Sequence, residues 1–219
     1  MDVANKRLFL ASDSTVHDYG EDSLKRGWGE FLAEFIPASA EVYNHAMSGR
    51  SSKTYIEEGR LDAIAKQLQT GDLLLIQMGH NDSTKSKPER YTDPEGSYRF
   101  YIKQYISAAK QHGAIPILVT PVARLQFEDG EFRNSHTPYC NALKDIAHEE
   151  NVLLIDLTSL SLARLKDVGY EEAEKWYLVS ILGEDYTHFT KAGAREMARI
   201  VGNALLSLTL LESQGVHIK

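Results

Sequence analysis

Five residues from four separate parts of the sequence have the functional groups that acyl transfer requires. Ser14 supplies a hydroxyl that can act as a nucleophile, and a serine needs a base to remove its proton. Asp185 and His188 lie three residues apart, close enough for the carboxylate to orient the imidazole that serves as this base. The backbone N–H groups of Ser14 and Gly49 and the side-chain amide of Asn81 are donors suited to a developing oxyanion. These residue types point to ester hydrolysis, provided that the fold brings them together.

The elements that must position these residues can be read from short apolar segments, each followed by a stretch with helical periodicity. We predict five strands, over residues 7–11, 41–46, 72–78, 115–120 and 152–156. The third and fourth segments are apolar at consecutive positions, which is typical of parallel strands covered by helices on both faces. The pattern therefore predicts a three-layer α/β/α sandwich around a five-stranded parallel sheet.

Three helices are indicated with start or stop signals. Residues 97–111 form an amphipathic pattern that ends near Gly113. Residues 137–150 begin with Thr137 as a possible cap and Pro138 at the first helical position, and Thr190 precedes a final helix from residue 191 to about 211. In an open parallel sheet the ligand site lies beyond the carboxyl ends of the strands, which is where Ser14, Gly49 and Asn81 follow the first three strands.

Composition limits the classes of protein and partner. No linker or repeat divides the 219 residues, so we expect one domain over residues 1–219. The 31 acidic and 24 basic residues give a formal net charge of −7 with no basic stripe, which excludes nucleic acid as an expected partner. No apolar run reaches the roughly 18 residues that span a membrane. Cys140 is the only cysteine and no secretion signal is visible, so we expect a cytoplasmic location.

Four short blocks in order resemble those of the SGNH (GDSL) hydrolase family: SDST at residues 12–15, SGRSS at 48–52, GHND at 79–82 and DYTHF at 185–189. The resemblance extends over residues 12–189 and implies a flavodoxin-like SGNH hydrolase fold. It also implies that Ser14 is the nucleophile, that Ser14, Gly49 and Asn81 form the oxyanion hole, and that His188 is the base. Asp185 orients that base. No metal or organic cofactor is implied.

One departure from the family pattern concerns the first residue of the nucleophile block. The family usually has glycine where this sequence has Ser12, so a left-handed backbone at that position would be strained. Asp13 is expected to brace the site without reacting. His80 and Asp82 are expected to support the loop that carries Asn81.

The blocks look closest to the rhamnogalacturonan acetylesterase branch, which implies removal of acetyl groups from pectic sugars. For a cytoplasmic enzyme, imported acetylated oligosaccharides become the expected substrates. Arg124 and His136 flank a segment expected to form a long loop after the fourth strand, and they are candidates for binding sugar hydroxyls or uronate carboxylates.

Three alternatives remain open from the sequence. The first is an SGNH esterase, lipase or thioesterase acting on another acyl group. The second is a metal-dependent phosphoesterase that would use Asp13, His80, Asp82 and His188, although no second compact ligand motif is present. The third is a carbohydrate-binding protein that has kept the fold without catalysis. The oligomeric state is also left open.

Overall fold

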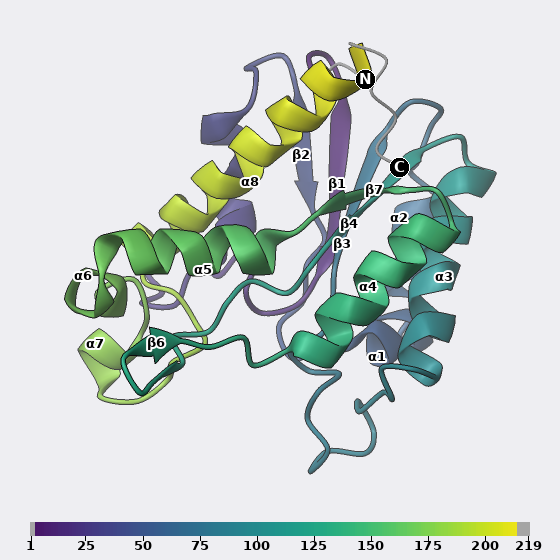
Figure 1. Ribbon diagram of the computed structural model, residues 1–219. Helices are drawn as coiled ribbons and strands as arrows, with labels where there is room; N and C mark the ends of the chain where they lie inside the picture. Colours follow the sequence, from purple (N-terminus) through teal and green to yellow (C-terminus); the bar gives the residue numbers. More distant parts are fainter. Residues whose placement is uncertain (1–2, 214–219) are drawn as a thin grey trace.

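The computed structural model describes residues 3–213, which form a parallel five-stranded sheet between two layers of helices (Figure 1). The strand order is β2-β1-β3-β4-β7, and neighbouring strands pair in parallel throughout. This is the flavodoxin-like order, and it confirms the predicted three-layer α/β/α class.

The strands of the main sheet are β1 (Arg7–Ser12), β2 (Glu41–Asn44), β3 (Leu73–Gln77), β4 (Ile115–Val119) and β7 (Leu153–Ile155). A separate hairpin consists of β5 (Phe127–Glu128) and β6 (Glu131–Phe132). The α-helices are α1 (Ser52–Glu57), α2 (Arg60–Ala65), α3 (Ser97–Gln111), α4 (Thr137–Glu149), α5 (Leu157–Val168), α6 (Tyr170–Glu174), α7 (Val179–Leu182) and α8 (Lys191–Ser213). Two 3₁₀ turns, η1 (Trp28–Glu30) and η2 (Leu32–Phe35), lie between β1 and β2.

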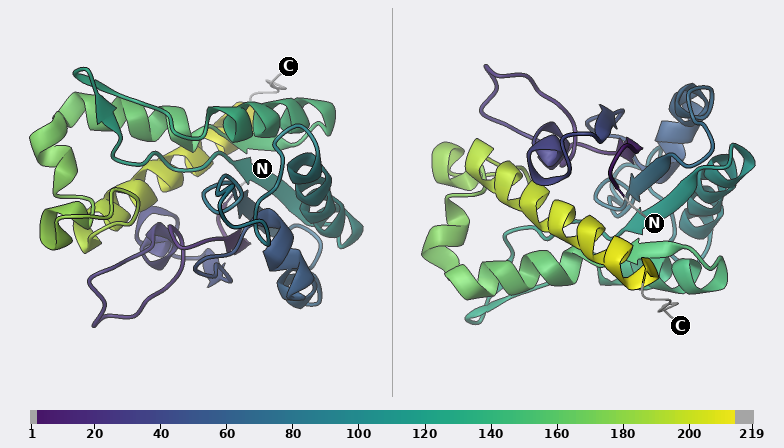
Figure 2. Two further views of the ribbon diagram at one scale, coloured as in Figure 1. Left: turned by 90° about the horizontal axis from the view of Figure 1, so that it is seen from below. Right: turned by 90° about the horizontal axis from the view of Figure 1, so that it is seen from above.

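Side chains of the central strands alternate between two hydrophobic clusters, one on each face of the sheet. In β3, Leu73 and Leu75 join the cluster under α5 and α8, whereas Leu74 and Ile76 join the cluster under α1 to α4. Figure 2 shows α8 in yellow crossing one face while the blue and teal helices cover the other. Because both faces are buried, the central strands are apolar at every position, as the sequence indicated.

The strand order reverses between β1 and β3, so their connections leave toward opposite faces of the sheet. A crevice forms at such a point beyond the carboxyl ends of the strands. The turn after β1 carries Ser14, the loop after β2 carries Gly49, and the loop after β3 carries Asn81. The fold therefore gathers the three blocks at one edge of the sheet.

The structure also differs from the sequence-based expectations in several places. The segment after β4 contains the β5–β6 hairpin, so it is not a continuous loop, and α5 to α7 were not predicted. The N-cap of α4 is His136, which leaves Thr137 as the first helical residue. Ser12 is the last residue of β1 and has no left-handed backbone, so the anticipated strain is absent. No helix within residues 3–213 is sufficiently long and apolar to cross a membrane.

Candidate active site

The structure brings Ser14, His188 and Asp185 into one hydrogen-bonded chain. The Ser14 Oγ lies 2.9 Å from His188 Nε2, although 174 positions separate the two residues in the sequence. The other ring nitrogen, His188 Nδ1, lies 2.8 Å and 3.0 Å from the two carboxylate oxygens of Asp185. This is the arrangement in which a carboxylate fixes the tautomer of an imidazole that accepts a proton from a serine.

The segment that carries the imidazole is fixed by backbone hydrogen bonds to two other parts of the chain. Phe189 is fully buried, and its carbonyl accepts a hydrogen bond from the N–H of Arg26. The carbonyl of His188 itself accepts from Leu178, and Thr190 N–H donates to the carbonyl of Trp176. Thr190 also caps α8 by accepting a hydrogen bond from Gly193 N–H, as the sequence indicated.

Asp185 is held in a left-handed conformation with φ of 76°, which aspartate tolerates better than most residues. Its Oδ1 accepts hydrogen bonds from the backbone N–H groups of Thr187 and His188. The carboxylate therefore closes a local turn at the same time as it orients the imidazole.

The electrostatics of this pair keep the carboxylate charged and the imidazole neutral. Burial raises the pKa of Asp185, but hydrogen bonds from His188 and Thr187 together with the His188 charge outweigh burial and lower that pKa below its ordinary value. Burial lowers the pKa of His188 below 6.5, and the nearby Asp185 only partly offsets this effect. At neutral pH His188 can therefore accept a proton.

The turn after β1 positions Ser14 through a buried polar network. Asp13 Oδ1 accepts hydrogen bonds from both the backbone N–H and the hydroxyl of Thr15, at 2.9 Å each. Gln77, the last residue of β3, donates to the Thr15 hydroxyl and accepts from the indole N–H of Trp28. The nucleophile turn is thereby tied to the neighbouring strand as well as to η1.

The three hydrogen-bond donors that the sequence predicts for an oxyanion come from the turn after β1 and from the loops after β2 and β3. Within the described residues, the N–H groups of Ser14 and Gly49 donate to no acceptor. Asn81 Nδ2 donates one hydrogen to the carbonyl of Arg50, at 2.9 Å, and its second hydrogen remains for a ligand. Gly49 has φ of 82°, and a Cβ built there would meet nothing within 4 Å, so the space beside it is open to an acyl group.

Asp82 connects the loop that carries Asn81 to the helix that follows Gly49. Its buried carboxylate accepts hydrogen bonds from the N–H of Ser52, at 3.1 Å, and from the hydroxyls of Ser52 and Thr92. Burial raises the pKa of Asp82 to about 6, against the effect of these donors. The two predicted oxyanion-hole loops are thus joined by a single carboxylate.

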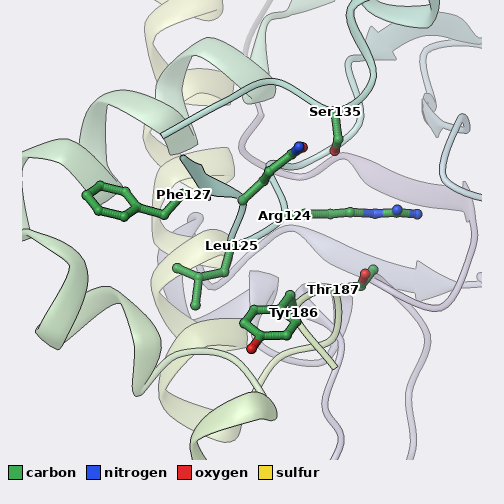
Figure 3. Close-up of a pocket in the computed structure, with 7 residues that line it drawn as sticks. Arg124, Leu125, Phe127, Ser135, Tyr186 and Thr187 are labelled. Atoms are coloured by element: carbon green, nitrogen blue, oxygen red, sulfur yellow. The ribbon is translucent and has the colours of Figure 1, made fainter. Parts of the chain in front are cut away.

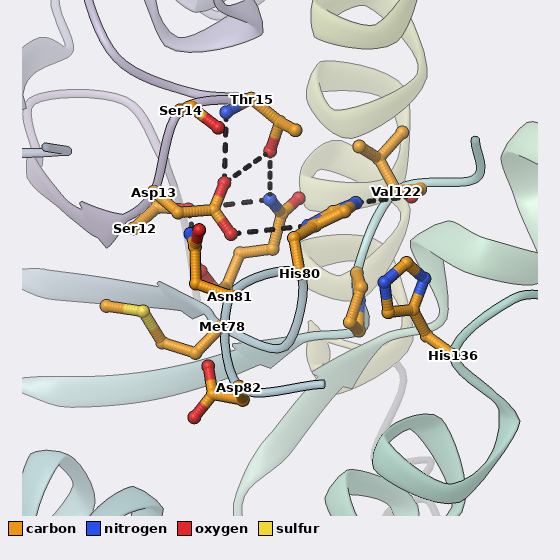
Figure 4. Close-up of polar contacts among 12 residues, drawn as sticks. Ser12, Asp13, Ser14, Thr15, Met78, His80, Asn81, Asp82, Val122 and His136 are labelled. Carbon is orange, nitrogen blue, oxygen red and sulfur yellow. Dashed lines mark hydrogen bonds and ion pairs between the residues drawn. The ribbon is translucent and has the colours of Figure 1, made fainter. Parts of the chain in front are cut away.

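Beneath the nucleophile, Asp13 and His80 form a buried pair (Figure 4). Asp13 Oδ2 lies 3.2 Å from His80 Nδ1, and the side chains are 0% and 3% exposed. His80 Nε2 lies 3.0 Å from the carbonyl of Val122, so each ring nitrogen faces an oxygen atom. Burial raises the pKa of Asp13, but His80 and Thr15 outweigh burial and the pKa is lowered.

Arg124 and His136, the predicted substrate-binding residues, occupy different environments. Arg124 is half-buried and lines a pocket of about 620 Å³ next to the His188 loop. His136 is only 1% exposed and its ring packs edge-on against His80, with centroids 4.6 Å apart. His136 is thus buried against His80 and is not among the residues that line this pocket.

Sequence reasoning missed two residues close to the site. The Tyr19 hydroxyl donates to the carbonyl of Ser14 at 2.9 Å, and burial raises the pKa of Tyr19 to about 12. Arg90 lies near enough to Arg124 for its charge to lower the pKa of Arg124, which burial already lowers. Neither residue belongs to one of the four blocks, and no spacing in the sequence marks them.

The side chains that a metal-dependent reaction would use are engaged elsewhere. Asp13 and His80 bind each other, Asp82 binds Ser52 and Thr92, and His188 faces Ser14. Within residues 3–213, no group of three or more His, Cys, Asp or Glu side chains is arranged to hold a metal ion.

Comparison with known proteins agrees with the fold and the geometry. Residues 9–201 match the GDSL-like lipase/acylhydrolase family, so the chain belongs to this family of ester hydrolases, as the four blocks indicated. It is 50% identical over 208 residues to the probable rhamnogalacturonan acetylesterase YesY of Bacillus subtilis strain 168, covering 94% of this chain and 96% of that one. It is 35% identical over 215 residues to the rhamnogalacturonan acetylesterase RhgT of the same strain, covering 93% and 91%.

A solved structure extends the likeness to three dimensions. The X-ray structure of YxiM from Bacillus subtilis superposes with a TM-score of 0.81 at 28% identity. The superposition covers 98% of this chain but only 58% of that one, so the present chain spans less than two thirds of that protein.

Proposed function

We propose that this protein is a serine acetylesterase that removes acetyl groups from rhamnogalacturonan-type oligosaccharides, with Ser14, His188 and Asp185 as its catalytic triad. The observation that carries the proposal is the 2.9 Å contact between Ser14 Oγ and His188 Nε2, backed by the Asp185 carboxylate. The relatives at 50% and 35% identity are named as rhamnogalacturonan acetylesterases, which supports an acetyl group as the acyl group that is removed and a pectic sugar as the substrate.

In the first half of the reaction, His188 Nε2 takes the proton of Ser14 as Oγ attacks the acetyl carbonyl carbon. The carbonyl oxygen gains a negative charge, which the N–H groups of Ser14 and Gly49 and the Asn81 amide stabilise. When the tetrahedral intermediate collapses, the bond to the sugar oxygen breaks and His188 donates its proton to that oxygen. The acetyl group remains on Ser14.

In the second half, a water molecule replaces the sugar alcohol. His188 removes one proton from the water, the hydroxide attacks the acetyl-enzyme, and the same three donors stabilise the oxyanion. Collapse releases acetic acid, which loses its remaining proton to solvent as acetate, and His188 returns its proton to Ser14 Oγ. Asp185 stays ionised throughout and stabilises the imidazolium that forms twice in each cycle.

The substrate is tested by acetate release from acetylated rhamnogalacturonan oligosaccharides, acetylated xylo-oligosaccharides and long-chain esters. We expect Ser14→Ala to lower kcat by about 10⁴-fold or more. Ser107→Ala, which removes an exposed hydroxyl on α3, serves as the matched control and should act like the wild type. Faster turnover of long-chain esters than of every acetylated sugar would refute the proposed substrate. Binding of acetylated sugar without acetate release would favour a carbohydrate-binding protein.

We also propose that residues 1–219 act as one domain in the cytoplasm. Both hydrophobic clusters lie on the same five-stranded sheet, which supports a single folding unit. Cys140 is the only cysteine, so the chain needs no internal disulfide and is compatible with a reducing compartment. Cell fractionation with an antibody tests the location, and recovery of the protein outside the cytoplasm would contradict it.

A further inference from the structure

Three buried side-chain nitrogens lack a hydrogen-bond partner in the part of the chain that the structure describes: Arg90 Nε, Arg124 Nε and His136 Nε2. They are neighbours in space. Burial lowers the pKa of Arg124, and the charge of Arg90 lowers it further. Burial likewise lowers the pKa of His136 to about 2, with contributions from the charges of His80 and Arg124. The buried side-chain nitrogens without a partner among the described residues therefore form a single cluster beside the active site.

Neither arginine in this cluster has an ion-pair partner among residues 3–213. Arg124 Nη2 reaches only the carbonyl of His80, and Arg90 Nη2 reaches only the Thr84 hydroxyl, each at a long 3.4 Å. Asp13 and Asp185 attract Arg124 from a distance, but each is already bound to a histidine.

A well-buried arginine elsewhere in the protein shows the contrast. The side chain of Arg26 is 10% exposed and pairs with Glu30 at 2.5 Å. A desolvated guanidinium normally needs such a partner, because an unpaired buried charge destabilises the folded state. Arg124 and Arg90 have no such partner, and their charges repel each other. We therefore expect the ligand itself to supply the partner of these guanidinium groups. That partner must be an anion.

The pocket next to this cluster has the lining of a sugar site. Arg124, Ser135 and Thr187 contribute polar groups, while Phe127 and Tyr186 contribute aromatic rings that are 40% and 48% exposed. Figure 3 shows the Arg124 side chain extending between Ser135 and Thr187, away from the Tyr186 ring. Thr187 directly precedes His188, so a ligand in this pocket lies beside the catalytic base.

We propose that this pocket is a uronate subsite, in which Arg124, reinforced by Arg90, binds the carboxylate of a uronic acid in the acetylated oligosaccharide. The planar guanidinium presents a pair of N–H donors that match the two oxygens of a carboxylate. Tyr186 lines the same pocket, and its half-exposed ring offers an apolar face to a sugar ring. This inference rests on the proposed function and specifies which feature of the substrate selects it.

The test separates binding from catalysis by using the Ser14→Ala background, in which no acetyl group is turned over. Calorimetry measures the Kd of digalacturonic acid and of the uncharged disaccharide galactobiose. We expect digalacturonic acid to bind at least about 10 times more tightly, and Arg124→Gln to weaken its binding by about 10- to 100-fold, the range for loss of charge-assisted hydrogen bonds. Arg90→Gln should weaken it less, because Arg90 acts as the second charge.

The matched control is Lys66→Gln, which removes one positive charge from an exposed position before β3, at the opposite edge of the sheet. Its Kd for digalacturonic acid should equal that of the Ser14→Ala parent. An equal loss of affinity for digalacturonic acid in Lys66→Gln and Arg124→Gln would mean that only the net charge of the protein matters, and this result would overturn the subsite. Inorganic phosphate is the third probe, and phosphate that competes as tightly as the uronate would overturn the assignment to a sugar acid.

Thermal unfolding of the unliganded variants gives an independent measurement. Because Arg124 and Arg90 repel each other without a bound anion, both Arg124→Gln and Arg90→Gln should fold and should raise Tm; a lowered Tm for both would contradict the unpaired cluster. A protein that binds uronate through Arg124 but releases acetate from no substrate would retain the subsite and refute the esterase. Acetate release that does not depend on a uronate in the substrate, together with equal binding of both disaccharides, would retain the esterase and refute the subsite.

Discussion

Replacing Asp13 with asparagine tests the buried pair beneath the nucleophile. Asp13 and His80 are 0% and 3% exposed, and the carboxylate lies 3.2 Å from an imidazole whose second nitrogen also faces an acceptor. Asp13→Asn removes the negative charge while it keeps the size of the side chain. The contacts of this buried carboxylate with His80 and Thr15 would then lose their charge assistance, and we expect the free energy of unfolding to fall by about 1–3 kcal/mol. For a chain of this length, such a loss lowers Tm by roughly 5 °C.

Urea unfolding of the wild type, Asp13→Asn, His80→Gln and the double variant measures the coupling between the two residues. Because the two side chains contact each other directly, we expect a coupling free energy of about 0.5–3 kcal/mol. The lowered pKa of Asp13 also sets the pH dependence. Its stabilisation is complete above the unfolded pKa of about 3.9 and is lost as pH falls through the lower folded pKa.

Two results would refute this reasoning. The first is a loss of less than about 1 kcal/mol for Asp13→Asn, which would mean that the negative charge of this buried carboxylate does not stabilise the fold. The second is strict additivity of Asp13→Asn and His80→Gln, which would mean that the two side chains do not interact. The advantage of the wild type over Asp13→Asn should also shrink below pH of about 4, and an advantage that grows there has the wrong sign.

Three further predictions concern catalysis and packing. Because neutral His188 is the active form and burial lowers its pKa, kcat/KM should fall with acid around a midpoint below 6.5, and a midpoint above 7 in the pH profile would contradict the site. Asn81→Ala should lower kcat about 10²- to 10³-fold with little change in KM, and steady-state kinetics in which KM alone changes would assign Asn81 to ground-state binding. Gly193→Ala should lower the free energy of unfolding by more than about 3 kcal/mol, because its Cβ would lie 2.0 Å from the carbonyl of Trp176. Gly59→Ala, which has open space but a left-handed backbone with φ of 72°, should cost only about 1–2 kcal/mol in the same denaturation assay, and equal losses would remove the steric explanation.

The sequence predicted the strands of the main sheet and the longest helices because these elements have strong local signals. Residues 73–76 and 115–119 are continuously apolar, and the predicted helix over 97–111 coincides with α3. The ends of the second strand were less accurate, because residues 45 and 46 lie beyond the paired part of β2. Helices α5 to α7 were missed since α5 follows β7 almost directly, without a separate turn signal.

The positions of Ser14 and His188 relative to each other follow from topology and could be anticipated only through the four blocks. No local pattern places side chains that are 174 positions apart at 2.9 Å. The burial of His136 and the proximity of Arg90 to Arg124 could not be predicted either. Both depend on how the segments after β3 and β4 pack on each other, which the periodicity of a single segment does not specify.

The buried ring of Phe189 has a consequence for how the enzyme loses activity on heating. Phe189, the residue after the base, forms one antiparallel β-bridge with Arg26 and a second with Tyr177. The imidazole can leave its position only if both β-bridges break and the buried Phe189 ring becomes exposed at the same time. Local unfolding of this segment alone is therefore costly in free energy. Inactivation should therefore coincide with the collapse of tertiary structure, and the hydrolase should remain competent until the whole molecule melts.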